Sequence, residues 1–267
     1  MFPLAVAILL QTRFAAPDAG LATAALASPR PRECRASAVG EGGVWSRLRS
    51  ADAQRYCDLL ARGHARLRAA PAEALSAGQA ALALAGPLPA VHVLIGRAQL
   101  ALGQGPSAYQ ELLAAEAEDA QALVDPKALH AYARAASLAG KPAESVRLYR
   151  LLASRVALLD DAREVAFVQI EAAAHVLAYA PAGTDEALGY LAQARRESLG
   201  LAAWIEGLRL VALQRGGHPD AGASKAGLPS AAALSAPSSA LPLLPEGMLA
   251  AVRAALTEIR PRKAKER

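Results

Sequence analysis

Apolar positions recur at helical spacing from about residue 50 to residue 216, and proline and glycine interrupt this pattern at regular intervals. Such interruptions predict turns, because proline cannot continue a helix and glycine accepts a positive φ. The segments between them are helix-length and alternate as pairs. The breaks fall at Ala70-Pro71, Gly86-Pro87, Gly103-Gln-Gly105-Pro106, Gly140-Lys-Pro142, Pro181-Ala-Gly183 and Gly216-Gly217.

A similar short string follows several of these breaks. A proline or a capping residue comes first, usually with glutamate after it, and then a small residue: Pro71-Ala-Glu-Ala74, Pro106-Ser-Ala108, Pro142-Ala-Glu-Ser145 and Thr184-Asp-Glu-Ala187. The string predicts a helix N-terminus, and its small residue lets two helices approach closely. Ala74 and Ala108 are 34 residues apart, Ala108 and Ser145 are 37 apart, and Ser145 and Ala187 are 42 apart. This period predicts stacked helix pairs.

Composition agrees with helices. Alanine makes up about a quarter of the 267 residues, aromatics only 4%, and asparagine is absent. A chain rich in Ala, Leu, Arg and Glu and poor in β-branched residues favours helix, which excludes all-β architectures. The Asp160-Asp161 pair is expected to cap a helix that begins near Arg163.

The stretch from Ile95 to Ala115 resembles a tetratricopeptide repeat. Its matching residues are Ile95 and Gly96 at the family's Leu-Gly pair, Gly103 at the turn between the helices, and Ala108 and Ala115 at the two small positions of the second helix. The next unit has Tyr132-Ala133 at the Leu-Gly pair, Gly140 at the turn, Ser145 at the first small position and Tyr149 at the aromatic position. The unit after that keeps the small positions Ala187 and Ala194, and Trp204 would lie in the first helix of a fifth unit. The resemblance implies an all-α fold of stacked antiparallel helix pairs. We therefore expect a right-handed superhelix of about four to five repeats over residues 51–216.

In this family the first helix of each pair lines a concave groove that holds a partner segment. The resemblance places Arg97 and Arg134 at equivalent groove positions, with these neighbours beside them: Val93, Leu100, Lys127, His130 and Leu138. It implies a protein partner with an acidic or extended segment. The family's carboxylate clamp uses asparagines, which this chain lacks. The alternative is that both arginines are solvated or pair with acids such as Glu171.

The C-terminal part changes in composition. Residues 217–244 are rich in Gly, Ser, Pro and Ala and are expected to be a linker. The pattern of residues 245–260 predicts an amphipathic helix. Residues 261–267 are expected to form a basic tail. The apolar face of that helix comprises Met248, Leu249, Val252, Leu256 and Ile259. It is expected to cap the open end of the repeats, and the alternative is docking on a partner or an anionic membrane.

The N-terminal part carries targeting and redox signals. Residues 1–27 are expected to be a signal peptide with an Ala25-Leu-Ala27 cleavage site or an apolar segment packed on the body, and residues 28–50 a basic leader. Export would place the protein in the periplasm or outside the cell; otherwise it is cytoplasmic. Cys34 and Cys57 would pair in an oxidising compartment and remain thiols in the cytosol.

The net charge of +5 is uneven, with nine arginines against four acidic residues over residues 28–70. A second class of function is therefore a binder of nucleic acid or anionic membrane through the leader and tail. Only Trp45 and Tyr56 offer aromatic stacking in these segments, so nucleic acid is not the expected partner.

No sequence motif indicates catalysis, and we expect a non-enzymatic protein with no cofactor and no bound metal. Gly103-Gln-Gly-Pro-Ser-Ala108 fits a dinucleotide fingerprint formally, but a helix precedes it where a strand is required. The histidines have no partner at metal-ligand spacing: His64, His92, His130, His175 and His218. Cys57 and His64 share a helix face but lie two turns apart, about 10 Å, which is too far for a nucleophile and its base.

Overall fold

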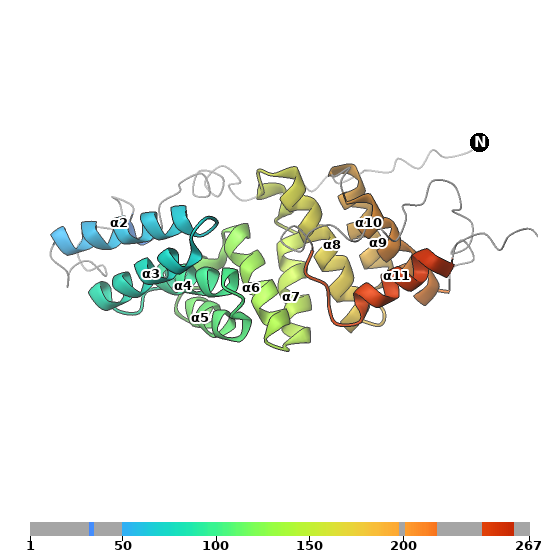
Figure 1. Ribbon diagram of the computed structural model, residues 1–267, viewed down its shortest axis with the longest axis horizontal. Coiled ribbons are helices and arrows are strands. Elements are labelled where there is room, and N and C mark those ends of the chain that lie inside the picture. Colours follow the sequence, from blue (N-terminus) through green and yellow to red (C-terminus); the bar gives the residue numbers. More distant parts are fainter. Residues whose placement is uncertain (1–31, 35–49, 198–200, 218–241, 259–267) are drawn as a thin grey trace, which may run out of the picture.

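The computed structural model describes residues 32–34, 50–197, 201–217 and 242–258, and within these ranges it is all-helical with no strand. The α-helices are α2 (Ser50–Arg66), α3 (Pro71–Ala85), α4 (Pro89–Ala101), α5 (Gly105–Glu118), α6 (Pro126–Leu138), α7 (Pro142–Ala153), α8 (Ala162–Tyr179), α9 (Thr184–Glu197), α10 (Ala202–Arg215) and α11 (Met248–Glu258). Short 3-10 helices are η1 (Arg32–Cys34), η4 (Ala120–Leu123) and η5 (Val156–Leu158). The helices follow one another along the long axis of the molecule (Figure 1).

Local chemistry sets the helix ends. Proline occupies one of the first two positions of α3 to α7, where its missing N–H costs nothing. Asp125 caps α6 and Asp161 caps α8; the latter accepts a hydrogen bond from Arg163 N at 2.8 Å, which confirms the predicted cap. Gly103 and Gly140 follow α4 and α6 with φ of 78° and 68°, values that non-glycine residues rarely adopt.

Consecutive helices pack against each other, as expected for helix pairs. The predicted small positions Ala74, Ala108, Ser145 and Ala187 are all fully buried. Gly96 shows why such residues are needed, because a Cβ there would lie 2.7 Å from Leu112 Cγ. The repeat spacing lengthens from 34 to 37 residues where η4 is inserted. It lengthens to 42 residues in the next unit, where η5 is inserted and α8 is 18 residues long.

Four tyrosines donate their hydroxyls to glutamates. Three of these hydrogen bonds join different elements, Tyr56 to Glu33, Tyr132 to Glu116 and Tyr149 to Glu171, and the fourth, Tyr190 to Glu186, lies within α9. The phenol rings of the first three lie within the apolar core while their hydroxyls find a charged acceptor. Burial, together with the glutamate charges, raises the pKa of each tyrosine, so all four remain neutral donors.

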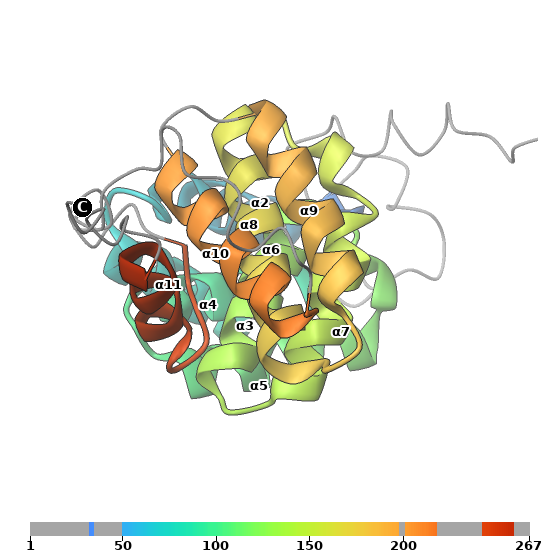
Figure 2. The same ribbon diagram turned by 90° about the vertical axis from the view of Figure 1, so that its right-hand side faces the viewer.

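Helix α11 packs beside α10, on the side away from α9 (Figure 2). Met248, Val252 and Leu256 of the predicted apolar face are buried, and Leu249 is half-buried against the same cluster. A Cβ on Gly207 of α10 would lie 2.5 Å from Val252 Cγ1, so the two helices approach closely. Trp204 lies in the core within α10, and α11 packs against that helix. Ile259 lies outside the described residues.

Several expectations fall outside the described part of the chain: the signal or apolar segment 1–27, the tail 261–267, nearly all of the leader 28–50 and most of the linker 217–244. Of the leader, η1 is described, and Cys34 is joined to Cys57 of α2 by a disulfide. Beside it, Glu33 accepts hydrogen bonds from Ala90 N at 3.2 Å and Tyr56 Oη at 3.1 Å. No described helix is both long and apolar enough to cross a bilayer.

Candidate functional site

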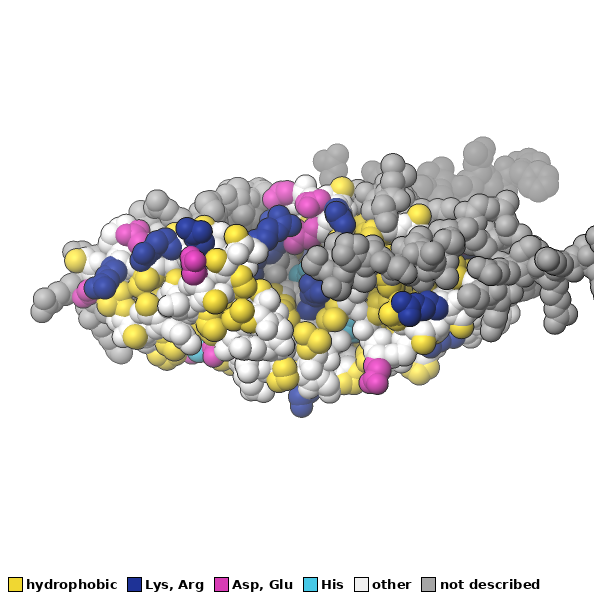
Figure 3. Space-filling model, viewed as in Figure 1, with side chains coloured by type: hydrophobic (Ala, Val, Ile, Leu, Met, Phe, Trp, Pro, Cys, Tyr) yellow, Lys and Arg dark blue, Asp and Glu magenta, His cyan; other side chains and the backbone are white. Residues whose placement is uncertain are grey.

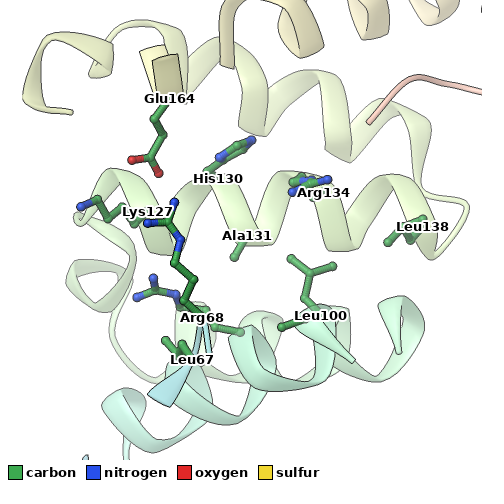
Figure 4. Close-up of a pocket in the computed structure, with 11 residues that line it drawn as sticks. Leu67, Arg68, Leu100, Lys127, His130, Ala131, Arg134, Leu138 and Glu164 are labelled. Atoms are coloured by element: carbon green, nitrogen blue, oxygen red, sulfur yellow. The ribbon is translucent and has the colours of Figure 1, made fainter. Parts of the chain in front are cut away.

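An open hollow of about 330 Å³ lies over α4 and α6 (Figure 3). It is lined by Leu67 and Arg68 after α2, Arg97, Leu100 and Ala101 of α4, Lys127, His130, Ala131, Arg134 and Leu138 of α6, and Glu164 of α8. The α6 residues follow one another along that helix, and Leu100 faces them from α4 (Figure 4). We refer to this feature as the basic hollow.

Six of the seven residues predicted for the groove line the basic hollow: Arg97, Leu100, Lys127, His130, Arg134 and Leu138. Val93 does not, because it is only 7% exposed and belongs to the buried cluster that includes Ala128 and Leu129 of α6. The prediction missed Leu67 and Arg68, since the first repeat carries a weak pattern there, and it missed Glu164 of α8.

Both groove arginines have acidic neighbours, as the alternative interpretation of the sequence proposed. Arg97 Nη1 lies 3.8 Å from Asp125 Oδ2, and Arg134 Nε lies 3.7 Å from Glu171 Oε1. Burial lowers the pKa of Arg97, and the charge of Asp125 opposes that shift. By contrast, neither Arg68 nor Lys127 makes an ion pair with another described residue. The basic hollow therefore keeps a positive excess.

His64 of α2 lies near this charge. Burial and the charge of Arg97 lower the pKa of His64 to about 4, while Asp125 acts in the opposite direction. His64 is therefore neutral at neutral pH and adds no charge to the basic hollow.

A buried carboxylate lies beside the basic hollow. Glu171 of α8 is 1% exposed, yet several groups compensate its charge. His130 Nε2 lies 2.7 Å from Oε2, and Tyr149 donates its hydroxyl to the same oxygen at 2.8 Å. Leu243 N donates to Oε1 at 2.6 Å, on the oxygen that Arg134 approaches. We call these five residues the Glu171 cluster.

The balance of forces on Glu171 favours the ionised form. Burial alone would raise its pKa, but the charges of His130 and Arg134 and the hydrogen bonds from His130 and Leu243 N lower it to about 2. Two of these groups, His130 and Arg134, also line the basic hollow. The Glu171 cluster thus links the exposed site to the core.

A second hydrogen-bonded pair lies one turn further along α8. His175 Nδ1 donates to the Glu171 carbonyl at 2.7 Å, and Ser137 Oγ lies 2.8 Å from His175 Nε2. Burial lowers the pKa of His175, which agrees with a neutral ring that donates at one nitrogen and accepts at the other. This connectivity is that of a nucleophile and its base. Ser137 is not among the residues that line the basic hollow, so we assign the pair no reaction.

The other described residues that the sequence offers as possible ligands or nucleotide-binding residues lie outside the basic hollow. His92 Nδ1 lies 2.7 Å from Glu111 Oε2, which ties α4 to α5. Gly103 to Ala108 forms the turn between these helices and the start of α5. His218 lies outside the described residues. Among the residues that the structure describes, no cluster of three or more His, Cys, Asp or Glu side chains offers a metal site.

Comparisons with protein-family models, with curated proteins and with solved structures find no match to this chain. The chemistry of the basic hollow and of the Glu171 cluster therefore carries the functional inference.

Proposed function

We propose that residues 51–216 form a tetratricopeptide-like right-handed superhelix that works as a non-enzymatic adaptor and binds an extended, acidic segment of a partner protein. The observation that carries this proposal is that six predicted groove positions of α4 and α6 meet around one open hollow. The recurring small residues and the packing of consecutive helices support the superhelix.

The charge of the basic hollow selects an acidic segment. Four basic residues line it, and Glu164 is the one acidic residue among the described lining residues. Figure 4 shows Glu164 at the end of the hollow where Lys127 and Arg68 lie. Since Arg68 and Lys127 make no ion pair within the described part of the chain, an incoming carboxylate that meets them displaces no acidic side chain that the structure describes.

The apolar lining selects aliphatic side chains between the acidic ones. Leu138 is 46% exposed, and Leu67 and Leu100 lie in the same lining. Covering such surface stabilises a complex by roughly 25 cal/mol per Å². An extended peptide fits this arrangement, because about three residues of strand span the distance between neighbouring packed helices of about 10 Å.

Fluorescence anisotropy with a labelled octapeptide of alternating glutamate and leucine tests the proposal. Lys127→Gln is expected to weaken binding about threefold to tenfold, because one cation of the lining is lost. Lys141→Gln is the matched control, since Lys141 is also exposed but lies outside the basic hollow. Binding of the wild-type protein should also weaken as salt is raised.

Two results would reject the proposal. One is equal affinity of the Lys127 and Lys141 variants. The other is equally tight binding of an octapeptide in which lysine replaces glutamate. Salt-sensitive binding of a DNA duplex without binding of either octapeptide would instead favour the nucleic-acid class, whose basic leader and tail lie largely outside the described residues.

A further inference from the structure

Residues 242–247, which lead into α11, run across α8 (Figure 1). We call them the strap. Pro242 and Pro245 are buried, and Leu243 and Leu244 are half-buried. The sequence predicts a linker up to residue 244, and the structure gives the described end of that segment a specific place on the body.

The strap is held through its backbone. Leu243 N donates to Glu171 Oε1 at 2.6 Å, across 72 residues of sequence. A backbone amide is present in every residue except proline, so this contact recognises an extended peptide without regard to its side chain. Glu171 is therefore an acceptor for peptide backbone, and the chain's own strap occupies it.

This backbone site adjoins the basic hollow. Arg134 Nε approaches the same oxygen that the strap amide binds, at 3.7 Å, and His130 binds the other oxygen at 2.7 Å. Arg134 and His130 also line the basic hollow. A partner segment that runs past Arg134 toward α8 therefore reaches the position that the strap holds.

We infer that the strap is an internal ligand, which competes with the partner segment for the backbone site at Glu171. This inference rests on the proposed function for the identity of the basic hollow. Because α11 is docked on α10 through Met248 and Val252, the strap is tethered at a high effective concentration, about millimolar for a short tether. A partner segment must displace the strap to extend its contact with the groove.

Binding of the strap sequence in trans tests the inference. The probe is a labelled peptide of residues 239–247, Ser-Ala-Leu-Pro-Leu-Leu-Pro-Glu-Gly, added to the full chain. Leu243→Pro in the protein removes the N–H donor and should tighten binding of the probe about tenfold, since the internal competitor is weakened. Leu243→Ala keeps the N–H and is the matched control, with affinity expected near that of the wild type.

The probe offers its own control. A second peptide carries proline at the position that corresponds to Leu243. It lacks the amide that binds Glu171, and it should not bind the Leu243→Pro protein. Equal affinity of the wild-type, Leu243→Pro and Leu243→Ala proteins for the unmodified probe would overturn the inference.

Hydrogen exchange on the wild-type protein decides the question if Leu243→Pro does not fold. An excess of unlabelled probe should speed exchange of the amides of Leu243 and Leu244, while those in the middle of α11 stay protected. Unchanged exchange in the strap would overturn the inference. Neither measurement uses the acidic octapeptide, so a failure of the strap inference and a failure of the proposed function give different patterns.

Discussion

Replacing Glu171 with glutamine removes the negative charge of the Glu171 cluster while keeping the size of the side chain. In the folded protein the pKa of Glu171 lies at about 2, against 4.5 for an unperturbed glutamate. Each pKa unit corresponds to about 1.4 kcal/mol, so the folded environment favours the ionised form by about 3 kcal/mol. We expect Glu171→Gln to lower the free energy of unfolding at pH 7 by an amount of this order.

The expected pH dependence follows from the direction of the shift. A carboxyl group whose pKa is lowered by folding stabilises the protein above its unfolded pKa, and this contribution is lost as the pH falls through the folded pKa. For Glu171 the loss runs from about pH 5 down to about pH 2. The difference in urea unfolding free energy between wild type and Glu171→Gln should therefore shrink as the pH is lowered from 7 toward 3.

Glu164→Gln is the control for this measurement, because Glu164 lies on the same helix and is half-buried without a described hydrogen bond. Its effect at pH 7 should stay within about 0.5 kcal/mol. If Glu171→Gln has an equally small effect, or if its effect does not depend on pH, the reasoning about the buried carboxylate is wrong.

Three further changes test the packing of the described residues by thermal or urea unfolding. Gln169 is fully buried with neither amide atom hydrogen-bonded, so Gln169→Leu should stabilise the protein by about 1–3 kcal/mol, whereas Gln193→Leu on the exposed face of α9 should not. Gly96→Ala should destabilise by about 1–3 kcal/mol because its Cβ would meet Leu112 at 2.7 Å, whereas Gly189→Ala, with no atom within 4 Å of its Cβ, should stabilise by up to about 1 kcal/mol. Reduction of the disulfide between η1 and α2 should lower stability by about 3 kcal/mol, because it joins residues 23 apart. An effect of opposite sign for Gln169→Leu, for Gly96→Ala or for reduction of the disulfide would contradict the packing described here.

The helices of the central repeats are predictable because their signals are local. Pro106 and Pro142 lie in the first turns of α5 and α7, and Gly103 and Gly140 follow the helices before them, so each boundary is marked by one or two residues. The pairing of helices follows from the recurring small residues, such as Ala108, that let two helices approach. The inserted η4 and η5 leave no such mark, which is why the period drifts without an evident cause in the sequence.

The sequence predicts only those residues of the candidate site that stand at the same position in successive helix pairs. Arg97 and Arg134 occupy equivalent positions in successive units, so a regular stack brings both to one surface. Val93 shares a helix face with Arg97 but turns into the core, because its turn of α4 packs against α6. The hydrogen bond from Leu243 to Glu171 joins residues 72 apart, and no periodic pattern connects them. Tertiary packing alone creates that part of the site.

Photo-crosslinking tests the central claim most directly. A glutamate–leucine octapeptide with a benzophenone at its centre would be irradiated with the full chain, and the adducts mapped by mass spectrometry. Binding in the basic hollow predicts adducts in α4 (Pro89–Ala101) and α6 (Pro126–Leu138), and their loss when unlabelled octapeptide is in excess. Adducts confined to α5 and α7, or adducts that excess octapeptide does not remove, would contradict the claim that this hollow is where the protein binds its partner.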